Sequence, residues 1–132
     1  MWFYEGKEFT SEDVGSYKAF VYEITNLEDG RKYIGKKRFT KLRTKPPLKG
    51  YKRKRKISSE SDWLTYWGSN DELKEDVKKL GEDKFKRVIL RLCKNLTESS
   101  YYEAKYQFDN NVLLTENYYN RLIAVKVRRP PD

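Results

Sequence analysis

Two tyrosines and two cations occupy positions from which they could act together. Tyr22 and Tyr33 lie 11 residues apart, and Lys36 and Arg43 follow the second tyrosine. A phenol with a pKa near 10 is a poor base unless nearby positive charge lowers that pKa. Lys36 and Arg43 are close enough in the sequence to supply such charge. Tyr22 also alternates with apolar neighbours, and that periodicity alone is typical of a core residue.

The residue types that are missing exclude several kinds of chemistry. The chain has no His, which excludes Ser-His-Asp and Cys-His catalysis and any site that uses a histidine base. Its one cysteine, Cys93, can form neither an intrachain disulfide nor a zinc finger. No apolar run approaches the roughly 20 residues of a membrane span, and the first residues lack a signal-peptide pattern. We therefore expect a cytoplasmic protein with no membrane partner.

A hairpin is predicted to hold the two tyrosines. Residues 19–25 are rich in strand-forming side chains, and residues 26–30 form a turn sequence that ends in Asp-Gly. A positive φ costs little at Gly30, so the chain can reverse there. Residues 32–34 then return as a second strand, which places the two phenols on adjacent strands.

The positive charge of the chain is concentrated directly after this hairpin. The formal net charge is +9, yet Arg31 to Lys56 contains fourteen basic residues and no acidic one. The rest of the chain holds 15 basic and 20 acidic residues, a net of −5. Such a local concentration favours phosphate-backbone binding, while a solvated loop or a localisation signal is the alternative. Pro46 and Pro47 forbid a continuous helix, so we expect a helical turn or two over 39–43 and then a basic loop over 44–60.

The remaining elements complete a small mixed domain. A helix over 98–109, capped by Thr97, would bury the stripe Tyr101, Ala104 and Phe108, and Glu103 lies off that stripe. Periodicity alone would leave Glu103 exposed. The other predicted elements are an edge strand at 2–4, a capped turn at 10–13, an aromatic helical turn within 58–68, a helix from a capping box at 69–72 to Gly81, a strand at 85–92 and a last strand at 122–127. This order predicts one α+β domain over 1–132, with a small, mostly antiparallel three-stranded sheet flanked by helices in the order β-β-α-β-α.

The sequence resembles the GIY-YIG endonuclease superfamily, which is named for two short strand motifs. The first is here Phe20-Val21-Tyr22, which departs from Gly-Ile-Tyr, and the second is Tyr33-Ile34-Gly35. The resemblance extends over about 19–120. It places the family's further site residues at Lys36, Arg43, Glu103 and Asn120, with Arg38 as the alternative arginine because the prolines shorten the expected helix.

The resemblance implies a metal-dependent DNA endonuclease that hydrolyses phosphodiester bonds. Glu103 would hold one Mg²⁺ or Mn²⁺, Tyr22 would activate or orient the attacking water, and Tyr33 would contact the phosphate or the water. Lys36 and Arg43 would lower the pKa of Tyr22, and the arginine would also neutralise the phosphate. Asn120 would hold the architecture or a phosphate contact. The pattern is most similar to small phage-encoded members, which would place the protein in the host cytoplasm.

DNA is the expected partner, and a homodimer is one way in which two strands could be cut. A non-catalytic basic protein that binds DNA or RNA is the alternative function. No separate DNA-recognition domain is expected, and no protein partner can be inferred. The expected DNA-contacting residues all belong to the basic segment: Lys37, Arg38, Lys41, Lys45, Lys49, Lys52, Arg53, Lys54, Arg55 and Lys56.

Overall fold

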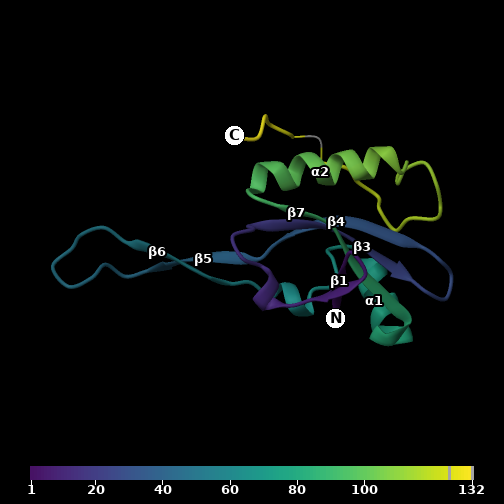
Figure 1. The fold of residues 1–132 in the computed structure, drawn as a ribbon, viewed down its shortest axis with the longest axis horizontal. Coiled ribbons are helices and arrows are strands. Elements are labelled where there is room, and N and C mark those ends of the chain that lie inside the picture. The colour runs from purple at the N-terminus through teal and green to yellow at the C-terminus, as the bar shows by residue number, and fades with distance from the viewer. Residues whose placement is uncertain (125, 132) are drawn as a thin grey trace.

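A five-stranded sheet forms the body of the protein. The computed structural model describes residues 1–124 and 126–131, apart from the side chains of Arg43 and Lys56. The strands of the sheet follow the order β2-β1-β7-β3-β4, and β5 and β6 pair separately (Figure 1). The elements are β1 (Trp2–Tyr4), β2 (Lys7–Phe9), β3 (Ala19–Asn26), β4 (Lys32–Arg38), β5 (Thr40–Lys45), β6 (Arg55–Glu60), α1 (Asp71–Leu80), β7 (Phe85–Cys93) and α2 (Leu96–Asp109), with 3-10 turns at Ser11–Asp13, Trp63–Thr65 and Glu82–Lys84.

The α+β class with a mostly antiparallel sheet is confirmed. The predicted core of the sheet is β4, β3 and β7, all antiparallel. The expectation of three strands is wrong, because the N-terminal hairpin β1–β2 joins the same sheet through a parallel pairing of β1 with β7. Trp2 from β1 is almost fully buried and packs edge-on against Phe20 and Tyr22. The large apolar area of that indole explains why so short a strand is retained.

The β3–β4 turn is closed by the side chains that suggested it. Asn26 Oδ1 accepts from the Glu28 N–H, and the Gly30 N–H donates to the Asn26 carbonyl. Gly30 has φ of 82°, the left-handed conformation that the Asp-Gly sequence predicts. The two strands then pair over seven residues, with Tyr22 directly opposite Gly35 and Ile24 opposite Tyr33.

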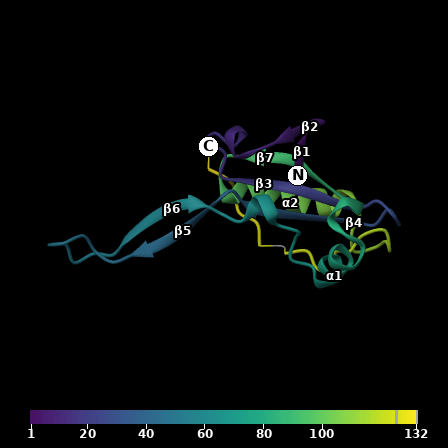
Figure 2. The same ribbon diagram turned by 90° about the horizontal axis from the view of Figure 1, so that it is seen from below.

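The two faces of the sheet are covered by different layers. Helix α2 lies across one face, and α1 together with the segment that precedes it lies on the other (Figures 1 and 2). The α1 side holds the larger apolar cluster, which includes Tyr22, Trp63 and Leu73. The α2 side holds a smaller one around Val21 and Ile34. The tyrosine hairpin therefore lies between two cores.

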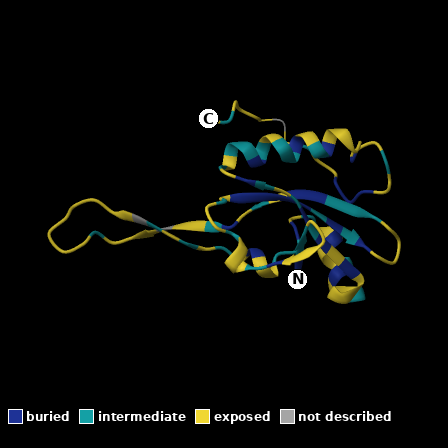
Figure 3. Cartoon of the chain, viewed as in Figure 1, coloured by how far each residue is buried: buried dark blue, intermediate teal, exposed yellow. Residues whose placement is uncertain are grey.

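The basic segment folds differently from the prediction. In place of a helical turn at 39–43, β4 runs to residue 38 and β5 pairs antiparallel with β6. The loop predicted over 44–60 is found only at 46–54, between these two strands. The hairpin points away from the body, so its like charges project into solvent and the backbone pairing is not opposed (Figure 3). Pro46 and Pro47 lie in the connection between these strands, where no ladder hydrogen bond is needed.

Four smaller expectations also differ from the structure. Helix α2 is capped by Asn95 and not by Thr97, because the Asn95 Oδ1 accepts from the Glu98 N–H at 2.8 Å. Its predicted apolar stripe is largely exposed, at 45% for Tyr101 and 55% for Phe108. Within the described residues, the predicted strand at 122–127 is irregular. The helical turn expected within 58–68 shrinks to a 3-10 turn at Trp63–Thr65, because 58–60 belong to β6.

Candidate active site

Tyr22 is held across a glycine of the neighbouring strand. Its side chain is 1% exposed, and a Cβ on Gly35 would lie only 2.5 Å from its hydroxyl oxygen and 2.8 Å from Cζ. Gly35 has no positive φ, so the reason for glycine there is space and not backbone conformation. A β-bulge in the β3–β7 pairing also falls between Val21 and Tyr22, and bulges commonly redirect side chains beside functional sites. The Tyr-Ile-Gly motif thus gives Tyr22 room to reach the outer strand.

Three phenols gather at this position. The ring centroids of Tyr33 and Tyr66 lie 6.2 Å and 6.0 Å from that of Tyr22, and the Tyr33 hydroxyl is 3.0 Å from Ser69 Oγ. Burial raises the pKa of Tyr22 well above 10, and the neighbouring phenols and Glu103 raise it further. The pKa of Tyr33 is raised as well, chiefly by burial. The two phenols are therefore neutral hydrogen-bonding groups in the free protein, contrary to the expectation that cations lower the pKa of Tyr22.

Glu103 lies on the side of α2 that faces the sheet and is half-buried. It lies one helical turn from Ser99 and one turn from Gln107, both of which are buried, so the inward face of α2 at this end is polar. Burial raises the pKa of Glu103, while the charge and the backbone N–H of Lys36 act to lower it. The negative charge of Glu103 contributes to the raised pKa of both Tyr22 and Tyr33. The carboxylate and the two hydroxyls therefore lie within electrostatic reach of one another.

The outer edge of β4 is where these groups meet. Asn120 is 2% exposed, and it forms a closed pair with Ile34: its Oδ1 accepts from the Ile34 N–H at 3.1 Å, and its Nδ2 donates to the Ile34 carbonyl at 2.9 Å. Gln107 Nε2 donates to the same carbonyl at 2.9 Å. Polar groups of alternate residues point to the same side of a strand, so the Lys36 N–H faces the same edge, beside Glu103. Asn120 is consequently an architectural residue in this structure.

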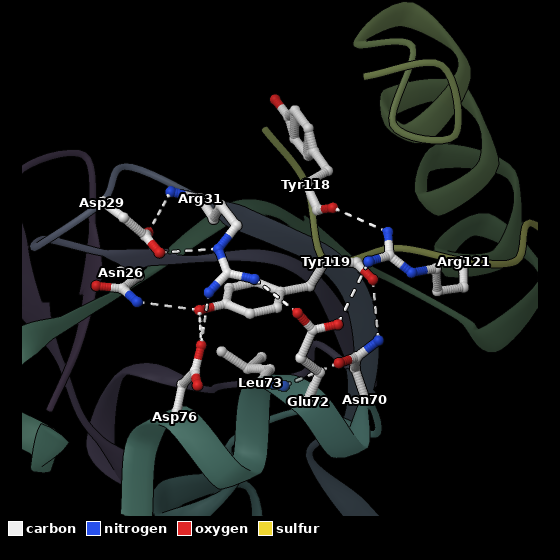
Figure 4. A network of polar contacts seen from close by, with 10 residues as sticks. All are labelled: Asn26, Asp29, Arg31, Asn70, Glu72, Leu73, Asp76, Tyr118, Tyr119 and Arg121. Atoms are coloured by element: carbon white, nitrogen blue, oxygen red, sulfur yellow. Dashed lines mark hydrogen bonds and ion pairs between the residues drawn. The ribbon is translucent and has the colours of Figure 1, made fainter. Parts of the chain in front are cut away.

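A polar network fixes the loop that carries Asn120 (Figure 4). The Arg31 guanidinium lies 2.7–2.8 Å from carboxylate oxygens of Asp29, Glu72 and Asp76, and it stacks on the Tyr119 ring at 4.3 Å. The Tyr119 hydroxyl donates to Asp76 at 2.7 Å. The network therefore ties the hairpin turn, α1 and the loop into one unit, and it holds the residue before Asn120 in place.

Lys36 and Arg38 border a cleft of about 460 Å³ next to this edge. Lys36 Nζ donates to Ser100 Oγ at 2.6 Å, and Ser99 and Lys41 also line the cleft. Arg38 lies two residues beyond Lys36 and so on the same side of β4. Lys36, Arg38 and Lys41 thus place positive charge on the lining of the cleft, which Asp62 also borders.

Arg43 lies in β5, opposite Ile57, and not on a helix as the family's pattern implies. Its side chain lies outside the described residues. Because β5 leads away from the body (Figure 1), Arg38 is the arginine that the described structure brings to the cleft.

Most of the expected DNA-contacting residues lie on the β5–β6 hairpin. Lys37 is different, because its Nζ is 2.6 Å from Asp62 and 4.1 Å from the centre of the Tyr66 ring. The Lys56 side chain lies outside the described residues. The exposed basic residues on the hairpin are Lys41, Lys45, Lys49, Lys52, Arg53, Lys54 and Arg55.

Sequence reasoning did not assign several residues that shape the site. Tyr66 falls within the predicted aromatic turn, Ser69 within the predicted capping box and Gln107 within the predicted helix over 98–109, and none of the three was assigned to the site. A hydroxyl or amide at i±4 from Glu103 was the available signal for the polar face of α2, since Ser99 and Gln107 occupy those two positions.

The donor set at the β4 edge suits a hard divalent cation. Glu103 supplies one carboxylate, and the described residues contain no cluster of three or more Asp, Glu, His or Cys side chains. Magnesium commonly binds through one or two carboxylates and keeps several waters. Burial raises the pKa of the Glu103 carboxyl, and a bound cation would stabilise its anionic form. The residues present therefore fit such an ion.

Comparison with known proteins adds independent findings. A family model described as "Putative endonuclease segE, GIY-YIG domain" matches residues 2–123. The chain is 33% identical over 103 residues to "Putative endonuclease segE" of Enterobacteria phage T4. This match covers 76% of the chain but only 39% of that relative, so the chain spans well under half of the relative's length. No solved structure matches the chain. Among the described residues no helix is sufficiently long and apolar to span a membrane.

Proposed function

Because the chain belongs to the GIY-YIG endonuclease family, we propose that it is a metal-dependent DNA endonuclease that hydrolyses phosphodiester bonds. The observation that carries the proposal is the packing of Tyr22 and Tyr33 around Gly35 of β4, with Glu103 beside the Lys36 N–H of the same strand. A cleft bordered by Lys36 and Arg38 lies next to that edge. Hydrolysis of a phosphodiester requires an oriented water, neutralisation of phosphate charge and stabilisation of the leaving oxygen. This arrangement offers a group for each requirement.

The phenols act by orienting reactants. Tyr22 and Tyr33 have raised pKa values and keep their protons at neutral pH, so each can donate one hydrogen bond and accept another. In this proposal Tyr22 orients the attacking water and Tyr33 donates to a phosphate oxygen. The pKa of Tyr22 must fall before it can remove a proton, and the arrival of positive charge at Glu103 would lower it.

The cations bind the phosphate. Lys36 and Arg38 extend from one side of β4 toward the cleft, and Arg38 can form paired hydrogen bonds to two phosphate oxygens. We assign the arginine role to Arg38 because the backbone carries residue 43 onto β5. When bound at Glu103, Mg²⁺ or Mn²⁺ would polarise the phosphate and stabilise the leaving oxygen. One such site cuts one strand, so a nicked circle is the first expected product.

Cleavage of supercoiled plasmid, with and without Mg²⁺, tests the function. We expect metal-dependent nicking by the unmodified chain and loss of at least 10³-fold activity in Glu103→Gln, with DNA affinity kept within a few-fold. Glu116→Gln, a change of an exposed carboxyl in the loop after α2, is the matched control and should cut normally. Normal cutting by Glu103→Gln would remove the assignment of this site.

A second pair of variants separates the two arginines. Arg38→Ala should reduce the cleavage rate by about 10²- to 10³-fold at saturating DNA, because a transition-state contact to the phosphate is lost. Arg43→Ala should weaken DNA binding and leave the rate at saturating DNA nearly unchanged. The opposite pattern would return the catalytic role to Arg43.

A further inference from the structure

The β5–β6 hairpin is a two-stranded ribbon whose two faces are both open to solvent. Leu42 is 61% exposed on one face, and Lys41 and Lys45 are exposed on the other. In Figures 1 and 2 the ribbon extends well beyond the sheet and the helices in both views. A two-stranded hairpin is marginal by itself in water, so its retention as an ordered arm points to a partner that covers it.

The base of this arm is firmly attached to the body. Phe39 is 1% exposed and packs against Phe20 and Trp63 with ring centroids at 4.6 Å and 5.0 Å. The Phe39 N–H donates to the Lys18 carbonyl, and the Ser61 N–H donates to the Phe39 carbonyl. The arm therefore leaves the body in a direction that its base sets.

Each face of the arm combines polar or charged groups with an apolar side chain. Residues that face each other in an antiparallel pair share a side, so Lys41, Lys45, Arg55 and Ile57 occupy one face of the ribbon. The opposite face carries Leu42, Thr44 and Ser58.

The tip of the arm carries both kinds of group. It is closed by a turn in which the Tyr51 N–H donates to the Leu48 carbonyl at 2.9 Å, with Gly50 at φ of 89°. Leu48 and Tyr51 are 52% and 71% exposed, and Lys49 and Lys52 adjoin them. The tip thus presents apolar side chains among cations.

We propose that this ribbon enters the major groove of duplex DNA next to the scissile phosphate; the inference rests on the proposed function. The major groove, about 12 Å wide, admits a two-stranded β-ribbon, whereas the minor groove is about half as wide. In the groove, the cations of the arm contact the phosphates of the walls, and Leu48 and Tyr51 reach base edges such as thymine methyl groups. A solvated basic loop would need neither the ordered turn nor the exposed apolar tip.

The dimensions of the arm fix how far from the cut it reaches. Each strand has six residues, which corresponds to about 20 Å, and the tip adds several ångströms. At 3.4 Å per base pair, the arm spans about 6–9 base pairs on one side of the cleaved bond. The contacted region is therefore asymmetric about the cut.

Groove-specific modification of the DNA tests the inference. The Glu103→Gln chain, which we expect to bind DNA without cutting it, is titrated without metal against three 30-base-pair duplexes of one sequence. One is unmodified, one is methylated at guanine N7 in the major groove, and one has its minor groove occupied by distamycin. We expect N7 methylation to weaken binding about tenfold and distamycin to change it less than twofold. The reverse order would overturn the inference.

A shortened arm provides the second measurement. Thr44 faces residue 56, so replacing 45–55 with Asn-Gly closes a two-residue hairpin in the same register. In the Glu103→Gln background this change should remove the discrimination between methylated and unmodified DNA and shorten one side of the footprint by about 6–9 base pairs. A footprint of unchanged length would refute the predicted position of the arm.

Charge-matched variants separate groove insertion from general attraction. Replacing Lys49, Lys52 and Lys54 with Gln should weaken binding at least tenfold, whereas the same change at Lys74, Lys78 and Lys79 on α1 should weaken it about twofold or less. Equal losses would show that only net charge matters. The unmodified chain is assayed separately for plasmid cleavage: no cleavage contradicts the proposed function, whereas cleavage without an effect of N7 methylation contradicts the groove inference alone.

Discussion

Gly35 is the position where one added methyl group should harm the site most. In Gly35→Ala the new Cβ would lie 2.5 Å from the Tyr22 hydroxyl oxygen and 3.0 Å from Tyr33 Cε2. Ordinary contacts begin near 3.4 Å, so the Tyr22 ring must move by about 1 Å. That ring is buried and packs against Trp2 and Tyr66, so it cannot swing into solvent.

Two opposing effects set the size of the stability change. Overpacking a filled core costs about 1–3 kcal/mol. Alanine loses less chain entropy than glycine on folding, which stabilises the fold by about 0.4–1 kcal/mol. This gain applies at Gly35 because its backbone has no positive φ. The net expectation is a loss of about 1–2 kcal/mol, or a Tm lower by about 3–8 °C for a chain of this length.

The effect on activity should be larger than the effect on stability. A reacting group displaced by 1 Å can lose about 10²-fold in rate, so we expect plasmid nicking by Gly35→Ala to fall at least that far at a temperature where the chain is folded. Gly30→Ala is the control. Nothing lies within 4 Å of its added Cβ, but the φ of 82° at this position strains alanine and should lower the free energy of unfolding by about 1 kcal/mol. That variant should unfold earlier but cut normally when folded. If Gly35→Ala keeps both its Tm and its rate, Tyr22 does not lie across this glycine.

Three further predictions concern the surroundings of the site. Asn120→Ala leaves the buried Ile34 N–H without its partner and should lower the free energy of unfolding in urea by about 1–3 kcal/mol; no loss would show that water replaces the amide. Arg31→Met removes three partly exposed ion pairs and the stack on Tyr119, and it should lower the free energy of unfolding by about 1–2 kcal/mol. In 1 M NaCl the contribution of the ion pairs should disappear and that of the stack should remain. Burial raises the pKa of Glu103 above its ordinary 4.5 in the folded chain, so ionisation destabilises the fold as pH rises through the raised pKa. Glu103→Gln should therefore have a higher Tm than the unmodified chain at pH 7 and the same Tm below pH 4.5. Mg²⁺ should raise the Tm of the unmodified chain but not that of the variant, and a Mg²⁺ concentration of ten times Kd should stabilise the fold by about 1.4 kcal/mol.

The hairpin could be predicted from sequence because its signals are local. Asn26, Asp29 and Gly30 close the turn through contacts within a few residues, so a short window contains all the required information. The same holds for Gly81, which ends α1 where the sequence indicated.

Hydrophobic periodicity alone could not predict the polar face of α2, because it ranks side chains only by how apolar they are. Ser99, Glu103 and Gln107 share one face of that helix, and they turn inward because the edge of β4 offers backbone partners such as the Ile34 carbonyl. A site that binds polar groups must be lined with polar groups, so this rule fails where function is located. Tyr101 and Phe108 are exposed for the same reason.

The basic arm was mispredicted for a different reason. Repulsion among Lys and Arg was expected to prevent regular structure, but side chains on a free ribbon point outward into water, where such repulsion is screened. Thr40 pairs with Glu60 and Leu42 with Ser58 through backbone hydrogen bonds. The pattern of charged side chains does not predict these bonds.

The amide of Asn120 has a consequence for self-association. An outer strand with unsatisfied N–H and C=O groups invites a strand from another molecule. Here both polar groups of Ile34 are already bonded by Asn120, and Gln107 shares its carbonyl, so the centre of β4 has no vacancy for a second chain. Two copies that cooperate to sever both strands of a duplex must therefore meet through other surfaces, because their sheets cannot join through the centre of β4.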